Sequence, residues 1–245
     1  MKTLSQTKLL MGAIFAVAMM LVVNLQAATK EVTAKVRAIR GTAQVSLNGT
    51  GWAPLKVNDN LKAGAVIKTG ADSSVDLFLN NSVVRVTPET TISFDKLLVT
   101  ETGSETVTET QLNLRSGRII GKFKKLAPRS KYEIKVPTGR VGIRGTDYDI
   151  TVVPMGNGHF KLTVTSLSGT LVGSAVNMQK VLVTAVINTG ETWSPDDGMT
   201  VLPPEVIAAA REALRESMET GKSVTVTVPD TVEYSEPNIG VSRTE

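Results

Sequence analysis

The feature that most constrains this fold is an alternation of apolar and polar residues with a period of two, which recurs along the chain. Tyr132, Ile134 and Val136 alternate with polar neighbours. The same pattern recurs at 75–79, 148–152, 160–164 and 224–228. Successive side chains of a strand point to opposite faces of a sheet, so this period predicts half-buried strands.

Turn-forming residues separate these segments, as expected for short strands joined by tight connections. They are Asn48-Gly49, Asn80-Asn81, Thr102-Gly103, Gly156-Asn157-Gly158 and Asp197-Gly198. Short, regularly spaced strands are typical of antiparallel sheets that pack on each other or close on themselves. We therefore predict an all-β fold, an antiparallel β-sandwich or roll of many short strands.

One helix is predicted near the C-terminus, at 203–219. Pro203-Pro204-Glu205 suits a first helical turn, and Gly221 suits the end of the helix. The apolar residues Val206, Ala210 and Met218, with Ala213 or Leu214, form one stripe, so the helix is amphipathic. It either covers a sheet face or edge, or it binds a partner. We predict a final strand at 223–228 and a loose tail at 229–245.

The N-terminal residues 1–28 have the layout of a secretory signal peptide. Lys2 and Lys8 precede an uncharged apolar run from Leu9 to Val23, and Ala27 and Ala28 supply small residues for cleavage. We predict an exported, periplasmic protein that is soluble and has no membrane span after cleavage. The alternative is an uncleaved anchor, because the uncharged stretch up to Ala28 is long enough to span a bilayer.

Few residue types suited to catalysis are present. The chain has no Cys, which excludes thiol nucleophiles, thiolate metal sites and disulfides. Its single histidine, His159, follows a turn at a strand start, and we interpret it as a turn residue. We predict that the protein is not an enzyme and has no cofactor or metal. A hydrolase with two carboxylates remains an alternative, because two strands can bring any two acids together.

Positive charge is concentrated in the middle of the sequence. From Arg115 to Arg144 there are ten basic residues and one acid, whereas from Glu191 onward eleven acids face four bases. The candidate anion-binding residues are Lys122, Lys124, Lys125 and Arg129. They would bind an anionic glycan or polymer of the cell envelope; an exported protein has little reason to bind nucleic acid. Alternatively, the acidic C-terminal half balances this solvated face.

The most distinctive segment is 136–148, which we interpret as a strand, a tight irregular connection and a second strand. Pro137 belongs at a strand end, and Gly142 and Gly145 permit positive φ. Arg144 needs an acceptor if it is buried, and Asp147 or Asp149 would supply one. The residues of interest here, as a signature and as contact candidates, are Pro137, Thr138, Gly142, Arg144, Gly145, Thr146 and Tyr148.

This segment resembles the signature of the FecR protein domain, in which a Thr-Pro pair is followed by Val-Arg-Gly-Thr and an aromatic residue. Ile143-Arg144-Gly145-Thr146 and Tyr148 match it, although here the proline precedes the threonine. Trp52, Leu55, Leu61, Gly64, Ile67, Thr69 and Gly70 match an earlier stretch of the family, and Leu114 to Arg118 and Ser166 to Thr170 match later ones. The resemblance covers roughly 32–190. It predicts a FecR-like β domain at 29–190 and a C-terminal extension at 191–228.

The resemblance implies a binding or sensing module that acts by protein–protein contact in envelope signalling. The family's best-known members carry a cytoplasmic anti-sigma segment and a transmembrane helix before this domain, and here only the predicted signal peptide precedes it. We therefore expect another envelope protein as the partner. The contact surfaces we expect are the connection 137–146, exposed strand edges and the helix 203–219. The alternative function is binding of an envelope polyanion or glycan by the basic face.

Overall fold

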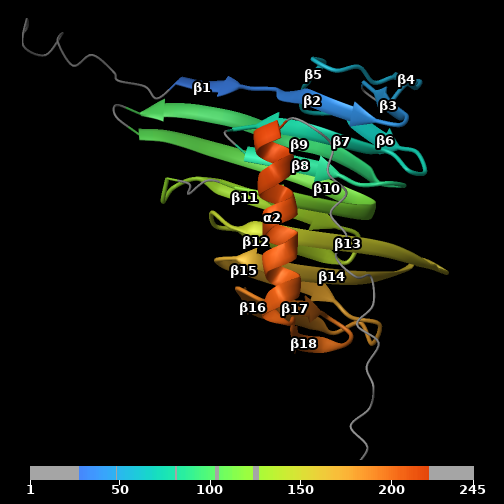
Figure 1. The fold of residues 1–245 in the computed structure, drawn as a ribbon, viewed down its shortest axis with the longest axis vertical. Helices are drawn as coiled ribbons and strands as arrows, with labels where there is room; N and C mark the ends of the chain where they lie inside the picture. The colour runs from blue at the N-terminus through green and yellow to red at the C-terminus, as the bar shows by residue number, and fades with distance from the viewer. Residues whose placement is uncertain (1–27, 48, 81, 103–104, 124–126, 221–245) are drawn as a thin grey trace, which may run out of the picture.

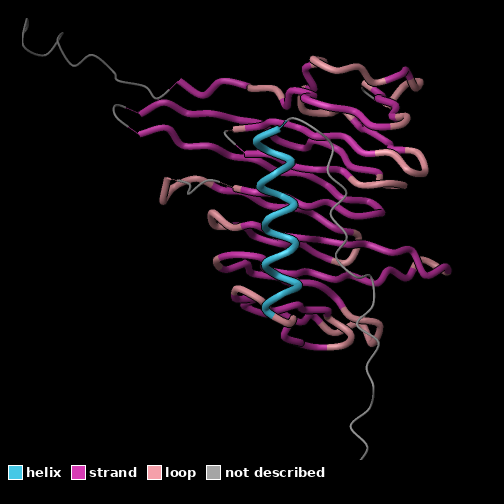
Figure 2. The backbone as a smooth tube through the Cα atoms, in the orientation of Figure 1, coloured by secondary structure: helices cyan, strands magenta, loops and turns pink. Residues whose placement is uncertain are grey.

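The computed structural model describes residues 28–47, 49–80, 82–102, 105–123 and 127–220. Most of them lie in strands, and one helix crosses the strands (Figures 1 and 2). The elements are β1 (Ala28–Glu31), β2 (Ala34–Arg40), β3 (Ala43–Ser46), β4 (Ala53–Pro54), β5 (Asn60–Leu61), β6 (Val66–Thr69), β7 (Ser74–Leu79), β8 (Ser82–Val86), β9 (Thr91–Thr102), β10 (Glu105–Lys122), β11 (Lys131–Val136), β12 (Gly139–Ile143), β13 (Asp147–Gly156), β14 (His159–Ser168), β15 (Thr170–Val176), β16 (Leu182–Asn188), β17 (Glu191–Ser194), β18 (Gly198–Val201) and α2 (Pro204–Thr220).

The strands form two sheets that share one long strand, β10. In sheet A the order is β4-β3-β6-β9-β10-β11-β12-β15-β16, and β1 pairs with the far end of β9. In sheet B the order is β5-β2-β7-β8-β10-β13-β14-β17-β18. All these pairings are antiparallel except that of β10 with β11. The predicted all-β, mostly antiparallel fold with one C-terminal helix is confirmed.

β10 passes from one sheet to the other at Gly117. Its first part pairs with β9 in sheet A, and residues from Gly117 onward pair with β13 in sheet B. Gly117 has a φ of +90°, and a Cβ there would lie 2.5 Å from the Cα of Thr90, so only glycine fits this bend. The backbone N–H of Arg118 donates to Thr90 Oγ1 at 3.0 Å, which fixes the crossing point.

The core lies between the two sheets. Inward-facing residues such as Ile134 of β11 and Ile150 of β13 are fully buried and belong to one continuous apolar cluster. Trp193 of β17 in sheet B packs so closely on Gly173 of β15 in sheet A that a Cβ at Gly173 would overlap the indole ring. Burial of alternate side chains between the sheets therefore holds the two layers together.

α2 lies across the outer face of sheet B. Its buried residues Ala210 and Leu214 form a second, smaller apolar cluster with Ile120 of β10 and Leu167 of β14. Figure 1 shows the helix running crosswise to the strands. The helix therefore covers a sheet face, which is one of the two roles expected from the sequence. The predicted signal peptide lies outside the described residues except for Ala28, which begins β1; the predicted strand 223–228 and tail 229–245 lie outside them entirely.

Candidate functional site

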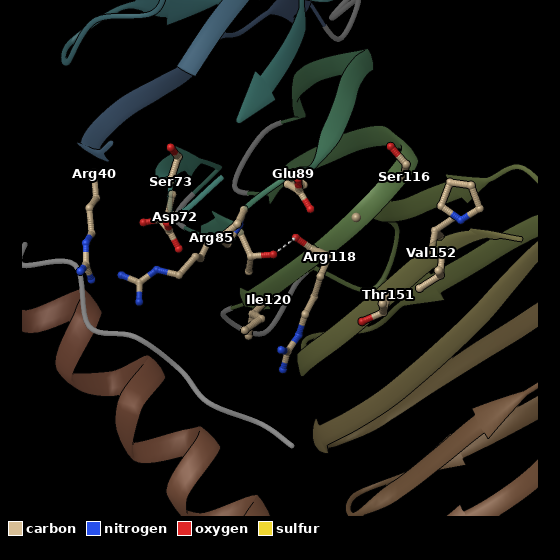
Figure 3. Close-up of a pocket in the computed structure, with 16 residues that line it drawn as sticks. Arg40, Asp72, Ser73, Arg85, Glu89, Ser116, Arg118, Ile120, Thr151 and Val152 are labelled. Carbon is tan, nitrogen blue, oxygen red and sulfur yellow. Dashed lines mark hydrogen bonds between the residues drawn. The ribbon is translucent and has the colours of Figure 1, made fainter. Parts of the chain in front are cut away.

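Beside α2, the outer face of sheet B contains a hollow of about 770 Å³. Its walls come from the ends of β2, β7, β8, β10 and β13, and Figure 3 shows arginine, hydroxyl and acidic side chains around it. We call it the sheet B hollow. Its charged lining residues are Arg40, Asp72, Arg85, Glu89 and Arg118.

Two of these arginines are held in ion pairs with aspartates of neighbouring strands. Arg85 donates from Nε to Asp76 Oδ1 at 2.7 Å and from Nη2 to Asp76 Oδ2 at 2.8 Å, and both side chains are almost fully buried. Arg118 donates to both carboxylate oxygens of Asp149, with a shortest contact of 2.6 Å. The charges of Arg85 and Arg118 are thus balanced by carboxylates of the protein itself.

Asp76, Asp147 and Asp149 alternate with apolar residues in the sequence, and this alternation predicts that they lie on solvated strand faces. That prediction is wrong, because all three are buried. They do lie on the outer face of sheet B, but ion pairs and neighbouring elements cover them. Burial raises the pKa of the Asp147 carboxyl, and the nearby Lys122 and a hydrogen bond with Ser168 partly offset this effect. Asp76 and Asp149 therefore pair with arginines of neighbouring strands rather than face solvent.

The signature segment is more regular than the sequence suggested. Pro137 and Thr138 form the two-residue turn between β11 and β12, and β12 continues to Ile143. The crossing from sheet A to sheet B then occupies 144–146, where Gly145 has a φ of +72°. Gly142 has no positive φ and lies in mid-strand. The expected irregular connection is therefore mostly a strand, because β12 finds a partner in β15.

Two residues of this segment do not behave as expected of contact residues. Thr146 and Tyr148 are buried, which contradicts a surface role for them. Arg144 is exposed, and Asp149 pairs with Arg118 in its place. The signature therefore mainly builds the crossing between the sheets.

The Tyr148 ring lies in the core, and its hydroxyl shares a hydrogen bond of 2.9 Å with the hydroxyl of Tyr132. Tyr132 comes from sheet A and Tyr148 from sheet B, so this bond links the two layers. Burial raises the pKa of both phenols. Gly121 of β10 leaves the space that the Tyr148 ring occupies, since a Cβ there would lie 2.5 Å from Cε1 of the ring.

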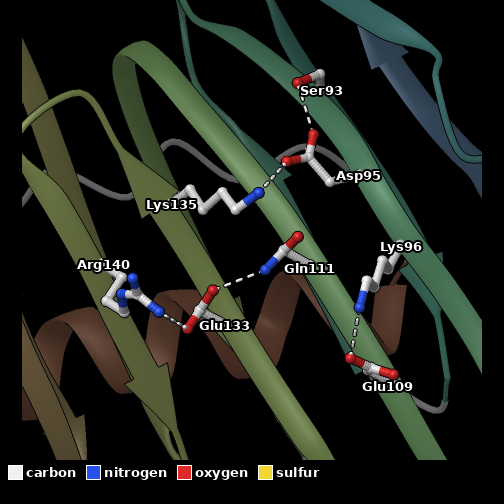
Figure 4. A network of polar contacts seen from close by, with 8 residues as sticks. All are labelled: Ser93, Asp95, Lys96, Glu109, Gln111, Glu133, Lys135 and Arg140. Carbon is white, nitrogen blue, oxygen red and sulfur yellow. Dashed lines mark hydrogen bonds and ion pairs between the residues drawn. The ribbon is translucent and has the colours of Figure 1, made fainter.

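Basic residues from the middle of the sequence are dispersed over both sheets and partly paired with acids. On the outer face of sheet A, Lys135 donates to Asp95 at 2.9 Å, and Arg140 lies 3.5 Å from Glu133 (Figure 4). Arg118 lies on the opposite face of the molecule, in sheet B. The linear run of positive charge thus does not form one basic face.

The four candidate anion-binding residues are described only in part. Lys122 is half-buried at the end of β10, opposite Asp147 in the register with β13. Arg129 is exposed in the connection before β11. Lys124 and Lys125 lie outside the described residues. An anion-binding role for this set therefore stays a prediction.

An exposed apolar surface, which the sequence reasoning missed, lies on the last hairpin of sheet A. Four outward-facing residues of β15 and β16 share it, with exposed fractions of 39 to 66%: Val172, Val176, Leu182 and Val186. Met178 and Val181, in the turn between the strands, are exposed as well. We call these six residues the β15–β16 surface. The signal in the sequence was the run Val181 to Ile187, which is apolar on both faces of its strand.

Groups suited to catalysis do not converge in the described part of the chain. The described residues contain no cluster of His, Asp and Glu that could hold a metal ion. His159 is exposed at the start of β14, next to the turn at Asn157 and Gly158. Asp196 and Asp197 lie in a turn, where Asp196 accepts a hydrogen bond from the backbone N–H of Met178. Among the helices of the described ranges, none has the length and apolar character needed to cross a membrane.

The fold and these surfaces define an all-β protein with two facing sheets, a helix across the outer face of one sheet and an exposed apolar hairpin at the edge of the other. Residues 65–170 match the sequence model of the family described as FecR protein. This match runs from the residue before β6 to the first residue of β15, and it agrees with the resemblance found in the sequence.

Comparison with solved structures finds two crystal structures of a protein assigned as an anti-sigma factor from Parabacteroides distasonis. Each is 12% identical to this chain, with a TM-score of 0.42 and 59% of this chain covered. The match spans 62% of one of those chains and 63% of the other, which is less than two thirds of their length. No curated protein sequence matches this chain.

Proposed function

We propose that this protein is an exported FecR-domain module that binds and senses by protein–protein contact in envelope signalling. The FecR domain supports a regulatory role in signalling. The predicted signal peptide at 1–28 supports a periplasmic site of action, with the mature protein soluble. The partner we propose is another envelope protein.

The observation that carries this proposal is the β15–β16 surface. Single exposed apolar residues are common on soluble proteins, but here six lie on one hairpin. Val172 lies opposite Val186 and Val176 opposite Leu182 in the register, so the apolar side chains form adjacent pairs on one face. A patch of this kind is typical of a surface that another protein covers.

The polyanion-binding alternative has less support from the charge distribution. Arg118, Lys135 and Arg140 each have an acidic partner on their own sheet face. A polyanion would have to compete with these acids for the same cations. We therefore place the contact surface at the apolar hairpin and not at the basic residues.

The test is capture of a partner from the exported fraction by three forms of the protein. Leu182→Glu places a charge on the β15–β16 surface, at a site already 66% exposed. Val201→Glu is the control, because Val201 is also exposed but lies on β18 of sheet B, outside the β15–β16 surface. We expect a partner that the wild type and V201E retain and L182E loses, and that binds again after purification. Equal capture by all three forms would refute the proposal.

A further inference from the structure

β16 is the last strand of sheet A in the described part of the chain. It pairs with β15 over seven residues without a register shift. The described residues provide no strand for its other edge. Within the described ranges, its backbone therefore has a free row of hydrogen-bonding groups, which is a template for another strand.

The hydrogen bonds next to β16 show which residues face that free edge. The backbone N–H of Asn177 donates to the backbone oxygen of Val181, so the backbone groups of Val181 point toward β15. Groups alternate along an antiparallel strand, so Leu182, Thr184 and Val186 direct their N–H and C=O groups away from β15. The N–H of Asn188, which is next in this series, donates to the carboxylate of Glu191 at 2.6 Å and not to β15.

The features by which natural proteins protect an edge strand are missing from β16. Such strands commonly carry a charge, a proline or a bulge that prevents pairing. From Val181 to Thr189 the chain has neither a charged residue nor a proline. The inner face of the strand is closed by Ile187, which is buried in the core. The edge is thus free of bulges, uncharged and anchored to the core through Ile187.

We propose that β16 pairs antiparallel with β16 of a second copy of this chain, about a two-fold axis at Thr184. In this register Leu182 faces Val186 of the second copy, Thr184 faces Thr184, and Val186 faces Leu182. All of these residues direct backbone groups to the free edge, so each pair exchanges hydrogen bonds. The result is a closed, isologous dimer with one sheet continuous across both copies.

Side-chain chemistry matches across this axis. Within one copy, a central row of hydroxyls joins Ser174 and Thr184, whose oxygens lie 3.1 Å apart, and apolar pairs flank it on both sides. The two-fold axis places the hydroxyl row of one copy beside the hydroxyl row of the other, and the apolar pairs of one copy beside those of the other. Threonine pairs and apolar pairs of this kind are favourable across neighbouring strands.

The charges at the two ends of β16 are complementary in the same arrangement. Lys180 precedes the strand, and the Glu191 carboxylate is held at the N–H of Asn188 at the other end. Antiparallel pairing places Lys180 of one copy opposite Asn188 of the second copy, next to that carboxylate. The ends of the two β16 strands therefore attract each other, and their uncharged central residues cause no electrostatic repulsion. This favours a second copy over a strand of unrelated sequence.

The mass of the purified protein in solution, measured by light scattering or sedimentation, tests the inference. The wild type is expected to have twice the mass of one chain. Thr184→Glu places two carboxylates against each other at the axis, and like charges directly opposite destabilise a strand pair. We expect it to have half the wild-type mass. Ser174→Glu is the matched control: it breaks the same hydroxyl contact on the same face, but it lies one strand away from the axis, and it should remain a dimer.

A mixing experiment separates loss of pairing from loss of folding. Thr184→Glu and Thr184→Lys should each be monomeric, and an equal mixture of the two should recover the dimer mass, because opposite charges then meet at the axis. A monomeric wild type, or a dimer that Thr184→Glu leaves intact, would overturn the inference. The inferred dimer depends on the edge of β16 and not on its outer face. A monomeric wild type that still captures its partner through Leu182 would therefore overturn the inference without contradicting the proposed function.

Discussion

Replacing Gly121 by alanine tests how the two sheets fit together at the signature tyrosine. The new Cβ would lie 2.5 Å from Cε1 of Tyr148 and closer still to Cζ, whereas carbon atoms in contact are about 3.5 to 4.0 Å apart. The ring would have to move by about 1 Å or more. Because Tyr148 is fully buried, no solvent-filled space can receive it.

The cost has two parts. Overpacking a dense core costs about 1 to 3 kcal/mol. Moving the ring also strains the 2.9 Å bond between the hydroxyls of Tyr132 and Tyr148, and a buried hydroxyl without a partner costs about 1 to 3 kcal/mol. Alanine also restricts the backbone of the unfolded chain, and this effect raises the free energy of unfolding by about 0.5 to 1 kcal/mol. We expect Gly121→Ala to lower the free energy of unfolding by about 1 to 5 kcal/mol.

Equilibrium unfolding in urea measures this change, and Gly142→Ala is the control. Gly142 is also a mid-strand glycine, but the nearest atom to its Cβ would be a backbone oxygen at 3.8 Å, so we expect little change or a small gain. Gly121→Ala should cost much less stability when it is added to Tyr148→Val than when it is made in the wild type. The reason is that valine leaves room for the new methyl group. Equal stability of the two alanine variants would refute the packing argument.

Three further outcomes are expected. Asp76→Leu should destabilise the protein by about 3 to 5 kcal/mol in urea unfolding, because it removes the bidentate carboxylate partner of buried Arg85, and adding Arg85→Met should recover part of the loss. The raised pKa of Tyr132 contributes stability that is complete below its ordinary pKa of 10.0 and is lost as pH rises above it, so Tyr132→Phe should lose less stability than the wild type in alkaline unfolding. Leu214→Ala should weaken the docking of α2 by about 2 kcal/mol or more, measured by faster amide hydrogen exchange in the helix.

Period-two alternation predicted much of the fold because it is a local signal. The alternating residues around Ile134, Ile150 and Leu162 lie in β11, β13 and β14 and face the core. The helix predicted at 203–219 is found at Pro204–Thr220, where proline and an apolar stripe mark it in the sequence. Each of these features depends on neighbours within a few residues.

The errors have a different origin, namely contacts between residues far apart in the chain. Alternation places Asp76 and Asp149 on the outer face of a sheet, but it does not show that Arg85 and Arg118 pair with them there. Similarly, the glycines of 139–143 suggested an irregular connection. This segment instead forms β12, because β15, about thirty residues further on, pairs with it. Burial and pairing at such distances are set by topology, which no short window of sequence contains.

β16 shows a disagreement between sequence and structure that bears on the proposed dimer. A strand that is apolar on both faces is typical of one buried on both sides. β8 behaves in this way, since all of its residues from Ser82 to Val86 are buried. β16 has a similar composition, but in a single chain only its inner face is covered, and Leu182 and Val186 are exposed on the other. Pairing of two copies lengthens this apolar face without covering it, so a protein partner across the paired hairpins would satisfy the pattern that the sequence of β16 shows.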